Sequence, residues 1–176
     1  MRKLMVEEMN RLTVEDFKDV TKFPFQIILD NIRSFNNVGS FFRTGDAFRT
    51  EKLILGGYTP HPPHREITRS ALGAENAVNW EKINDITPYI LELKDAGYRV
   101  FAIEQAEGSL SLEQFDPRPG DRYAFIFGNE VEGVRDEIMD LCDGCLEIPQ
   151  FGTKHSLNVS VSAGIVLWSF VSKNIT

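Results

Sequence analysis

Ile148-Pro-Gln-Phe-Gly-Thr-Lys-His-Ser-Leu-Asn-Val-Ser-Val-Ser-Ala-Gly-Ile-Val-Leu-Trp168 is the stretch of sequence that decides the fold. Its second half spaces apolar residues as a helix does, and it predicts a C-terminal helix over about residues 156–173. A plain core helix needs one capping residue at its start. This approach instead carries a Pro, a Gly, a Lys, a His, two Ser and an Asn, and the surplus of polar groups indicates a site.

Apolar runs and helical patterns alternate along the rest of the chain. We expect strands at residues 25–30, 52–56, 77–80, 98–103, 123–127 and 145–148, and helices at residues 37–48, 65–72, 84–95 and 134–142. This alternation predicts an α/β domain with a mostly parallel sheet over residues 23–176. Residues 1–22, charged and modestly amphipathic, are expected to form an N-terminal helical extension or arm.

Size and composition fit one compact domain, because 176 residues with 42% hydrophobic content can bury a sizeable core. No apolar run approaches the roughly 20 residues of a membrane span. Glu7 and Glu8 interrupt the segment where a secretory signal needs an apolar core. Only Cys142 and Cys145 are present, too few for a disulfide framework. We therefore expect a soluble, cytoplasmic protein with no membrane partner.

The charge is unevenly distributed between the two halves of the chain. Net charge is −7, yet residues 1–70 hold 11 Lys and Arg against 9 Asp and Glu, whereas residues 71–176 hold 8 against 17. A polyanion should therefore meet the first half. The candidate contacts are Arg2, Lys3, Arg11, Arg33, Arg43, Arg49, His61, His64, Arg65 and Arg69.

Ligands bind beyond the carboxyl ends of the strands in a parallel sheet, so the loops that follow the strands are considered together. Asn31, Asn36, Asn37 and Gly39 follow the first strand, and a Gly-Asn-Glu-Val-Glu-Gly loop follows the strand at 123–127. Each loop alone is explained by a cap or a turn. Their coincidence at one edge of a sheet favours a binding site.

Other chemistries lack their motifs. The chain has no G-x-G-x-x-G after a strand, no P-loop and no G-x-S-x-G elbow. Cys142 and Cys145 are spaced as in zinc sites or redox motifs. Zinc would need two further ligands, and the three scattered His supply no evident pair. A redox role is disfavoured because the pair lies at the C-terminus of a predicted helix, which destabilises a thiolate. We expect no metal.

Three of the loops together resemble the SpoU/TrmH family of RNA ribose 2'-O-methyltransferases, part of the SPOUT superfamily. The matching segments are residues 31–48, 127–133 and 147–168, and they agree in order, spacing and residue type. The resemblance implies S-adenosylmethionine as cofactor and RNA as partner. The catalytic and ribose-site positions that it implies are Asn37, Arg43, Glu130, Ser156 and Asn158, and the cofactor-binding positions are Gly128, Ile148 and Leu157, with Glu104 the next residue expected to line that pocket.

The resemblance further implies a homodimer and a C-terminal trefoil knot, which general connection rules would exclude. Departures from the family pattern are mild: Phe35 stands where Pro is frequent, Val131 where Gly is frequent and Gln150 where Met is frequent. A guanosine of tRNA is the expected target. Two alternatives stay open, namely the same reaction on rRNA and an idle RNA-binding protein that retains the cofactor pocket. Lys154 and His155 have no assigned role.

Overall fold

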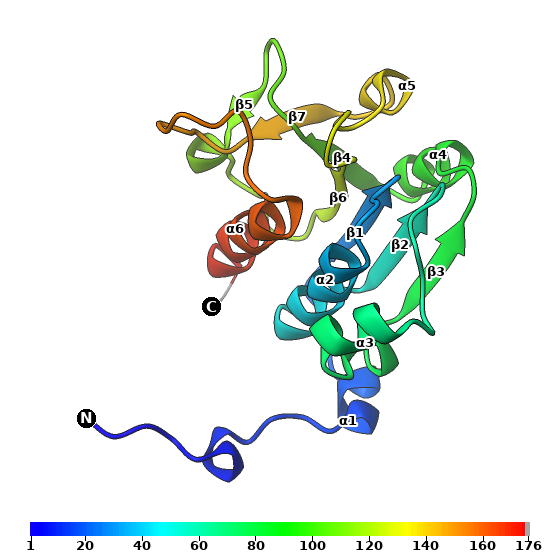
Figure 1. Cartoon of the computed structure of the whole chain (residues 1–176). Helices are drawn as coiled ribbons and strands as arrows, with labels where there is room; N and C mark the ends of the chain where they lie inside the picture. The colour runs from blue at the N-terminus through cyan, green and yellow to red at the C-terminus, as the bar shows by residue number, and fades with distance from the viewer. Residues whose placement is uncertain (175–176) are drawn as a thin grey trace.

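A seven-stranded, fully parallel sheet forms the centre of the computed structural model, which describes residues 1–174 apart from the side chain of Val6 (Figure 1). Its strands lie in the order β3-β2-β1-β6-β4-β7-β5. Their bounds are β1 Phe25–Asp30, β2 Lys52–Gly56, β3 Trp80–Ile83, β4 Tyr98–Ile103, β5 Leu110–Ser111, β6 Arg122–Phe127 and β7 Gly144–Glu147. Because all pairs are parallel, the carboxyl ends of the strands meet at one edge.

Helices cover both faces of the sheet, as a parallel sheet requires. The helices are α1 Val14–Asp19, α2 Phe35–Ala47, α3 Arg65–Ala71, α4 Thr87–Asp95, α5 Asp136–Met139 and α6 Val159–Ser172, with 3-10 turns at Val6–Met9, Ala74–Asn76 and Leu112–Gln114. Helices α2, α3 and α6 share one face, where α2 contacts both of the others. Helices α4 and α5 lie on the opposite face.

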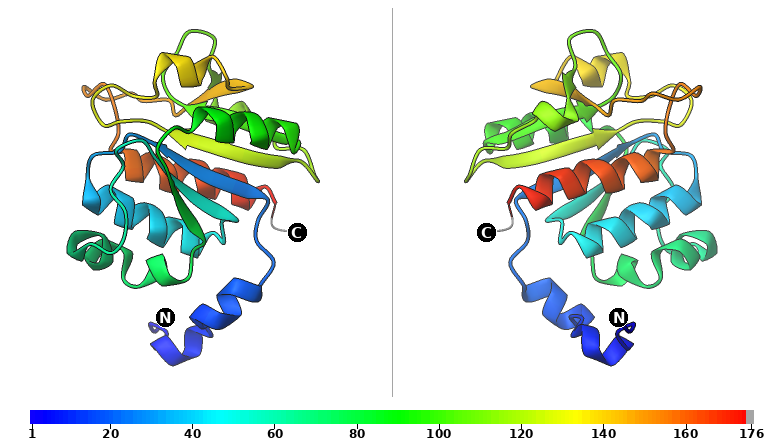
Figure 2. Two further views of the ribbon diagram at one scale, coloured as in Figure 1. Left: turned by 90° about the vertical axis from the view of Figure 1, so that its right-hand side faces the viewer. Right: turned by 90° about the vertical axis from the view of Figure 1, so that its left-hand side faces the viewer.

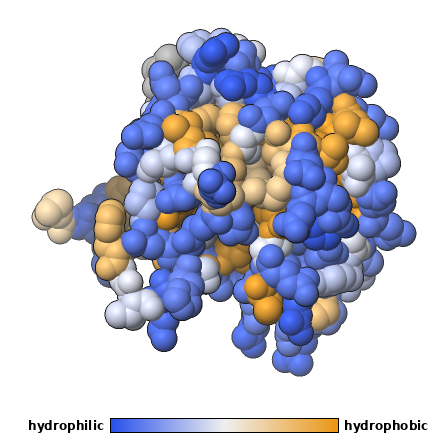
Figure 3. Space-filling view, turned by 90° about the horizontal axis from the view of Figure 1, so that it is seen from above, coloured by the Kyte–Doolittle hydropathy of each residue, from blue (hydrophilic) through white to orange (hydrophobic). Residues whose placement is uncertain are grey.

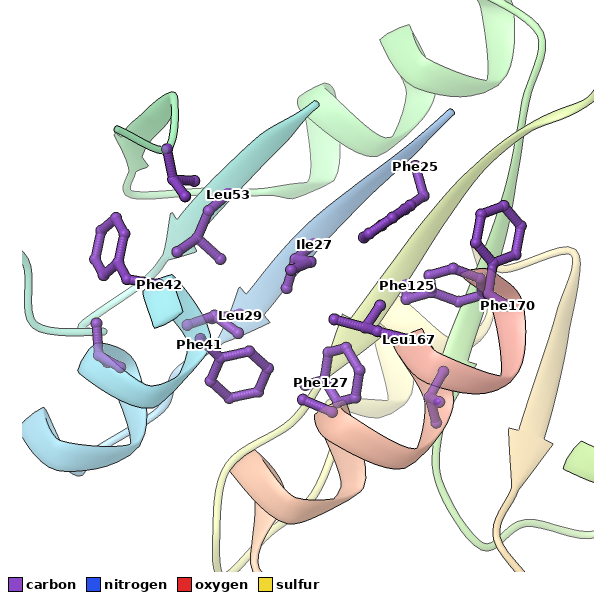
Figure 4. Packing of buried hydrophobic residues seen from close by; sticks show 14 of the residues in the cluster. Phe25, Ile27, Leu29, Phe41, Phe42, Leu53, Phe125, Phe127, Leu167 and Phe170 are labelled. Carbon is purple, nitrogen blue, oxygen red and sulfur yellow. The ribbon is translucent and has the colours of Figure 1, made fainter. Parts of the chain in front are cut away.

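Alternation along the strands builds two separate cores. On one face the side chains of Phe25, Ile27 and Leu29 from β1 meet α6 residues such as Leu167 and Phe170 (Figure 4). The rings of Phe25 and Phe170 lie edge to face, with centroids 5.4 Å apart. Ile28 points to the other core, with α4. Strand β1 is therefore buried on both faces, and it fixes the position of the loop that follows it at the carboxyl edge of the sheet.

Most of the expected elements are confirmed, with shifted boundaries. The strand expected at residues 77–80 is wrong, because the chain there leaves a 3-10 turn and pairs only from Trp80 onward. Helix α4 begins at Thr87 rather than at residue 84, since the Asp85 carboxylate accepts a bond from the Thr87 amide and Pro88 sits in the first turn. Helix α5 is one turn long, and the short strand β5 was not expected.

The first 22 residues are only partly helical. Helix α1 is capped by Thr13, whose Oγ1 accepts a bond from the Asp16 amide, and Phe17 anchors it in the core. The segment before it extends away from the body of the molecule (Figure 2). Within the described residues, no helix combines the length and apolarity that a membrane span needs. The trefoil knot stays a prediction.

Candidate active site

A cavity of about 640 Å³ opens at the carboxyl ends of β4, β6 and β7. Three loops form its walls: residues 103–106 after β4, residues 127–134 after β6 and residues 146–150 after β7. The approach to α6, residues 156–159, closes it. This volume lies within the range of small-molecule pockets. Viewed from above, the molecule gathers apolar surface near the middle of this side, with hydrophilic residues around it (Figure 3).

Three polar side chains from distant segments form a chain of hydrogen bonds beside the cavity. Asn158 Nδ2 donates to Asn37 Oδ1 at 3.1 Å, and Asn37 Nδ2 donates to Glu130 Oε1 at 2.9 Å. Glu130 also accepts bonds from the backbone amides of Arg33, at 2.9 Å, and Ser34, at 3.0 Å. The loop after β1, the loop after β6 and the start of α6 are therefore held in one arrangement.

Glu130 is held in its ionised form by these bonds. Its partial burial alone would raise the carboxyl pKa. The hydrogen bonds from Arg33, Asn37 and Ser34 outweigh that effect, so the pKa lies below its ordinary value of 4.5. Glu130 is therefore an anchor for the surrounding donors and a poor proton acceptor at neutral pH.

Asn158, not Ser156, begins the C-terminal helix. Its Oδ1 accepts bonds from the Ser160 amide at 2.9 Å and the Val161 amide at 3.3 Å. One amide side chain thus caps α6 with its oxygen and reaches Asn37 with its nitrogen. The exposed Ser156 lies before the cap, on the wall of the cavity.

The loop after β6 approaches its own backbone too closely for any side chain at Gly128. A Cβ there would lie 2.1 Å from the carbonyl carbon of Gly133 and 2.1 Å from the Val134 nitrogen. Gly133 has a positive φ of 74°, and its own Cβ would lie 2.3 Å from a carboxylate oxygen of Glu104. That Glu104 oxygen also accepts a bond from the Val134 amide at 3.2 Å.

The cavity is strongly acidic. Its lining carries the carboxylates of Glu104, Glu130, Glu132, Asp136 and Glu147, and no Lys or Arg among residues 1–174 lines it. Such a wall attracts cations and repels phosphates, because field lines concentrate in a cleft of one sign. Its ligand should therefore carry positive charge.

The structure gathers nearly all of the expected site residues. All four expected cofactor contacts, Gly128, Ile148, Leu157 and Glu104, line the cavity, as do Glu130, Ser156 and Asn158. Asn37 lies behind the wall, bonded to two of these residues.

Arg43 is set apart from the other expected catalytic residues. It is exposed on α2, it does not line the cavity, and its guanidinium has no hydrogen bond or ion pair in the part of the chain that the structure describes. The catalytic role expected for Arg43 stays a prediction.

Sequence reasoning gave no role to Asn129 or Tyr58 at this edge, although Asn31, which contacts both, was named. Asn129 donates from Nδ2 to the Asn31 carbonyl at 2.8 Å and to the Tyr58 hydroxyl oxygen at 2.6 Å. Asn129 and Asn31 lie in loops that were singled out, whereas Tyr58 follows β2 with no motif to mark it.

A partly buried ion pair lies at the same edge of the sheet. Asp30, fully buried at the end of β1, pairs with Arg135 at 2.9 Å. In the sequence, the sign of such a pair was a charged residue at the end of an apolar strand.

No three His, Cys, Asp or Glu side chains of residues 1–174 are grouped so that they could hold a metal ion.

Comparison with known proteins identifies a family. A model described as the SpoU rRNA Methylase family matches residues 24–168. A 23S rRNA (guanosine-2'-O-)-methyltransferase of Neisseria meningitidis serogroup B is 30% identical over 159 residues, which cover 90% of this chain and 62% of that protein. A tRNA (guanosine(18)-2'-O)-methyltransferase of Aquifex aeolicus is 30% identical over 144 residues, covering 81% of this chain and 66% of that protein.

Solved structures are similar over most of the chain. An AdoMet-bound rRNA methyltransferase from Sinorhizobium meliloti has a TM-score of 0.81 at 26% identity and covers 91% of this chain. A structure described as giving insights into the 2-OH methylation of C/U34 on tRNA has a TM-score of 0.73 at 26% identity. The match covers 85% of this chain and 95% of the chain in that structure. The chain spans about three-fifths of the length of the Neisseria and Sinorhizobium proteins.

Proposed function

Because the chain belongs to the SpoU family of RNA methylases, we propose that it methylates a ribose 2'-hydroxyl of RNA with S-adenosylmethionine as methyl donor. The observation that carries the proposal is the acidic cavity at the carboxyl edge of the sheet. S-adenosylmethionine carries a sulfonium, an ammonium and a carboxylate and is positive overall, whereas nucleotide cofactors carry phosphates and are negative. The carboxylates of the wall therefore suit this cofactor better than a nucleotide.

The cofactor would lie against the loops that follow β4, β6 and β7. Gly128 leaves room for close approach of the ligand to the backbone, and Leu157 and Ile148 offer apolar contact. When bound, the cofactor would supply an electrophilic methyl group, and the electron pair of the broken C–S bond would stay on sulfur as a neutral thioether. Glu104 offers a carboxylate, although one of its oxygens already accepts the Val134 amide.

The hydrogen-bonded chain of Asn158, Asn37 and Glu130 positions the acceptor side of the site. These three residues join the cavity wall to α2, on which Arg43 stands. Glu130, with its lowered pKa, stays ionised and serves as a positioning residue rather than as the base. Ser156 offers an exposed hydroxyl to the ribose at the cavity wall. The proton of the ribose 2'-hydroxyl passes to water.

Arg43 stabilises charge that develops on the ribose oxygen, or binds an adjacent phosphate. A guanidinium is protonated at neutral pH and does not act as a base unless its pKa is strongly lowered. Arg43→Lys should therefore lower the methylation rate by about 10-fold or more, because the planar fork is lost. Calorimetry should find the cofactor affinity of this variant unchanged. Near-full activity at neutral pH would contradict a role for the fork.

A guanosine of tRNA is the proposed target. Both curated relatives are named for guanosine, one in rRNA and one in tRNA. The structure that this chain covers to 95% of its length is named for C/U34 of tRNA, so it favours tRNA over rRNA, while guanosine rests on the two relatives. Methylation of rRNA is the second candidate, since the Neisseria relative acts there by name.

Two copies of the chain are proposed to form the working unit. Helix α6 leaves an apolar stripe uncovered, with exposed fractions of 51% at Val161, 38% at Ile165 and 53% at Trp168. Such a stripe favours a partner surface. A second copy packed there would lie beside Asn158 and the site, and two copies would also double the basic half of the chain.

Calorimetry with S-adenosylmethionine and with ATP tests the cofactor proposal. Both ligands contain adenosine, but only S-adenosylmethionine matches the charge of the wall. We expect saturable binding of S-adenosylmethionine and none of ATP at the same concentrations. Preferential binding of ATP, or no binding of either ligand, would overturn the proposal. Cofactor binding without methylation of any RNA would favour the idle RNA-binding protein.

A further inference from the structure

The loops that follow β1 and β2 are joined by two hydrogen bonds. Asn31 Oδ1 accepts the Tyr58 amide at 3.1 Å, and the Ile32 amide donates to the buried Thr59 Oγ1 at 3.0 Å. Gly57, between β2 and Tyr58, has a positive φ of 60°. The backbone of Tyr58 is therefore held in place by hydrogen bonds to the loop after β1.

The other end of the Tyr58 side chain is fixed as well. Its hydroxyl oxygen accepts a bond from Asn129 Nδ2 at 2.6 Å. Asn129 is itself held, because its Oδ1 accepts the amides of Val131 at 2.8 Å and Glu132 at 3.1 Å. Tyr58 is nevertheless 58% exposed. An apolar ring is thus held still in solvent, and its phenol reaches the residue next to Glu130.

The loops that follow β1 and β2 carry basic residues, unlike the cavity wall. Arg33, His61 and Arg65 are exposed on the two neighbouring segments, after β1 and after β2, whereas the cavity wall is acidic. Arg33 donates its backbone amide to Glu130, and no side chain of residues 1–174 is bonded to its guanidinium, which could meet a phosphate. A nucleic-acid strand would therefore run over the ends of β1 and β2, with the cofactor on the other side of Glu130.

We propose that Tyr58 is a stacking platform for an unpaired RNA base beside the methylated ribose. This inference rests on the proposed function and names the form of RNA that the site takes, namely a single-stranded or looped segment. An unstacked base gains from a fixed aromatic ring, because little conformational freedom is lost on binding. A base inside a duplex cannot reach such a ring.

Fluorescence of a 2-aminopurine-labelled RNA tests the platform directly. The probes are a hairpin with 2-aminopurine in its single-stranded loop and the same labelled strand paired in a full duplex. Wild-type protein should bind the hairpin more tightly and change the 2-aminopurine emission through stacking. Tyr58→Leu should weaken hairpin binding by about 10-fold and abolish the emission change. Tyr58→Phe keeps the ring and should stay within about 3-fold of wild type.

Tyr89→Leu is the matched control. Tyr89 is half-buried, whereas Tyr58 is exposed, but its hydroxyl is bonded too, donating to Gln26 Oε1 at 2.6 Å. Gln26 lies near the opposite end of β1, away from the site. This variant should bind the hairpin as wild type does, and thermal unfolding of every variant checks its folding.

The possible failures are distinguishable. Wild-type binding of the hairpin with an unchanged Tyr58→Leu affinity would overturn the platform alone. Failure of Tyr58→Phe to retain the signal would also overturn it. Absence of hairpin and cofactor binding in the wild type would overturn the proposed function itself.

Discussion

Glu130 shows how a single carboxylate fixes the site. Three donors converge on it from Arg33, Ser34 and Asn37, and their bonds keep its pKa below 4.5 despite partial burial. Charge-assisted bonds of this kind are stronger than neutral ones. Glu130→Gln would replace one accepting carboxylate oxygen with an NH2 group, which would face the N–H donors of Arg33, Ser34 or Asn37. The free energy of unfolding should therefore fall.

The effect of Glu130→Gln should depend on pH. A carboxyl group with a lowered folded-state pKa stabilises the fold above its ordinary pKa of 4.5, and this contribution is lost as pH falls through the lowered value. Denaturant unfolding should therefore show wild type more stable than the variant at pH 7, with the difference shrinking below about pH 4.5. A difference that stays constant down to pH 3 would contradict the role of Glu130.

Gly128→Ala tests the close approach of the loop after β6. The added Cβ would meet backbone atoms of Gly133 and Val134 at 2.1 Å, which no rotamer change relieves. We expect loss of cofactor binding and a destabilisation of about 2 kcal/mol or more. Gly152→Ala is the control, because its Cβ would meet nothing within 4 Å. Equal cofactor affinities in the two variants, measured by calorimetry, would argue against the account of the loop.

At the scale of elements, the start of α6 joins helix capping to the site. Asn158→Ala should cost about 1 kcal/mol of stability and also break the bond to Asn37. Asn158→Asp keeps the capping oxygen but loses the donor, so it should recover stability and remain slow in methyl transfer. The denaturation midpoint and the methylation rate, measured side by side, separate the two roles. An Asp variant with wild-type activity would exclude a role for the amide nitrogen.

The sequence predicted the sheet well because β1 and β6 are mostly apolar and, apart from Arg122, buried on both faces. It predicted the start of α6 less well. Ser156 and Asn158 are both good caps, and the choice depends on a bond to Asn37, 121 positions away. The strand at residues 77–80 failed for a similar reason, since Ala77 and Val78 are buried in a turn rather than in a strand. Tyr58 left no periodic signal because its partners lie on other segments.

At the scale of the whole molecule, the apolar stripe of α6 should hold two copies together. Val161→Lys combined with Ile165→Lys places two charges on exposed positions of the stripe. We expect analytical ultracentrifugation to find a dimer in the wild type and a monomer in this variant, with methylation reduced. Leu91→Lys is the control, because it also places a Lys at an exposed apolar position, but on α4, on the opposite face of the sheet. A variant that remains dimeric would show that the interface lies elsewhere.

The division of charge also belongs to the whole molecule. The acidic cavity lies over β4, β6 and β7, and the basic positions lie over β1 and β2, with Glu130 and Asn37 between them. In the proposed function, this arrangement would separate a cationic cofactor from an anionic RNA and bring them together only at the ribose. It would let a chain of net charge −7 act on RNA as proposed.

Transfer of an isotope-labelled methyl group to RNA tests the central claim most directly. The protein would be incubated with labelled S-adenosylmethionine and RNA from a strain that lacks its gene, and nucleosides would be identified by mass spectrometry. The account predicts a labelled 2'-O-methylnucleoside, with guanosine in tRNA as the expected carrier. Label on a base, or no label on any RNA from a preparation that binds the cofactor, would contradict it.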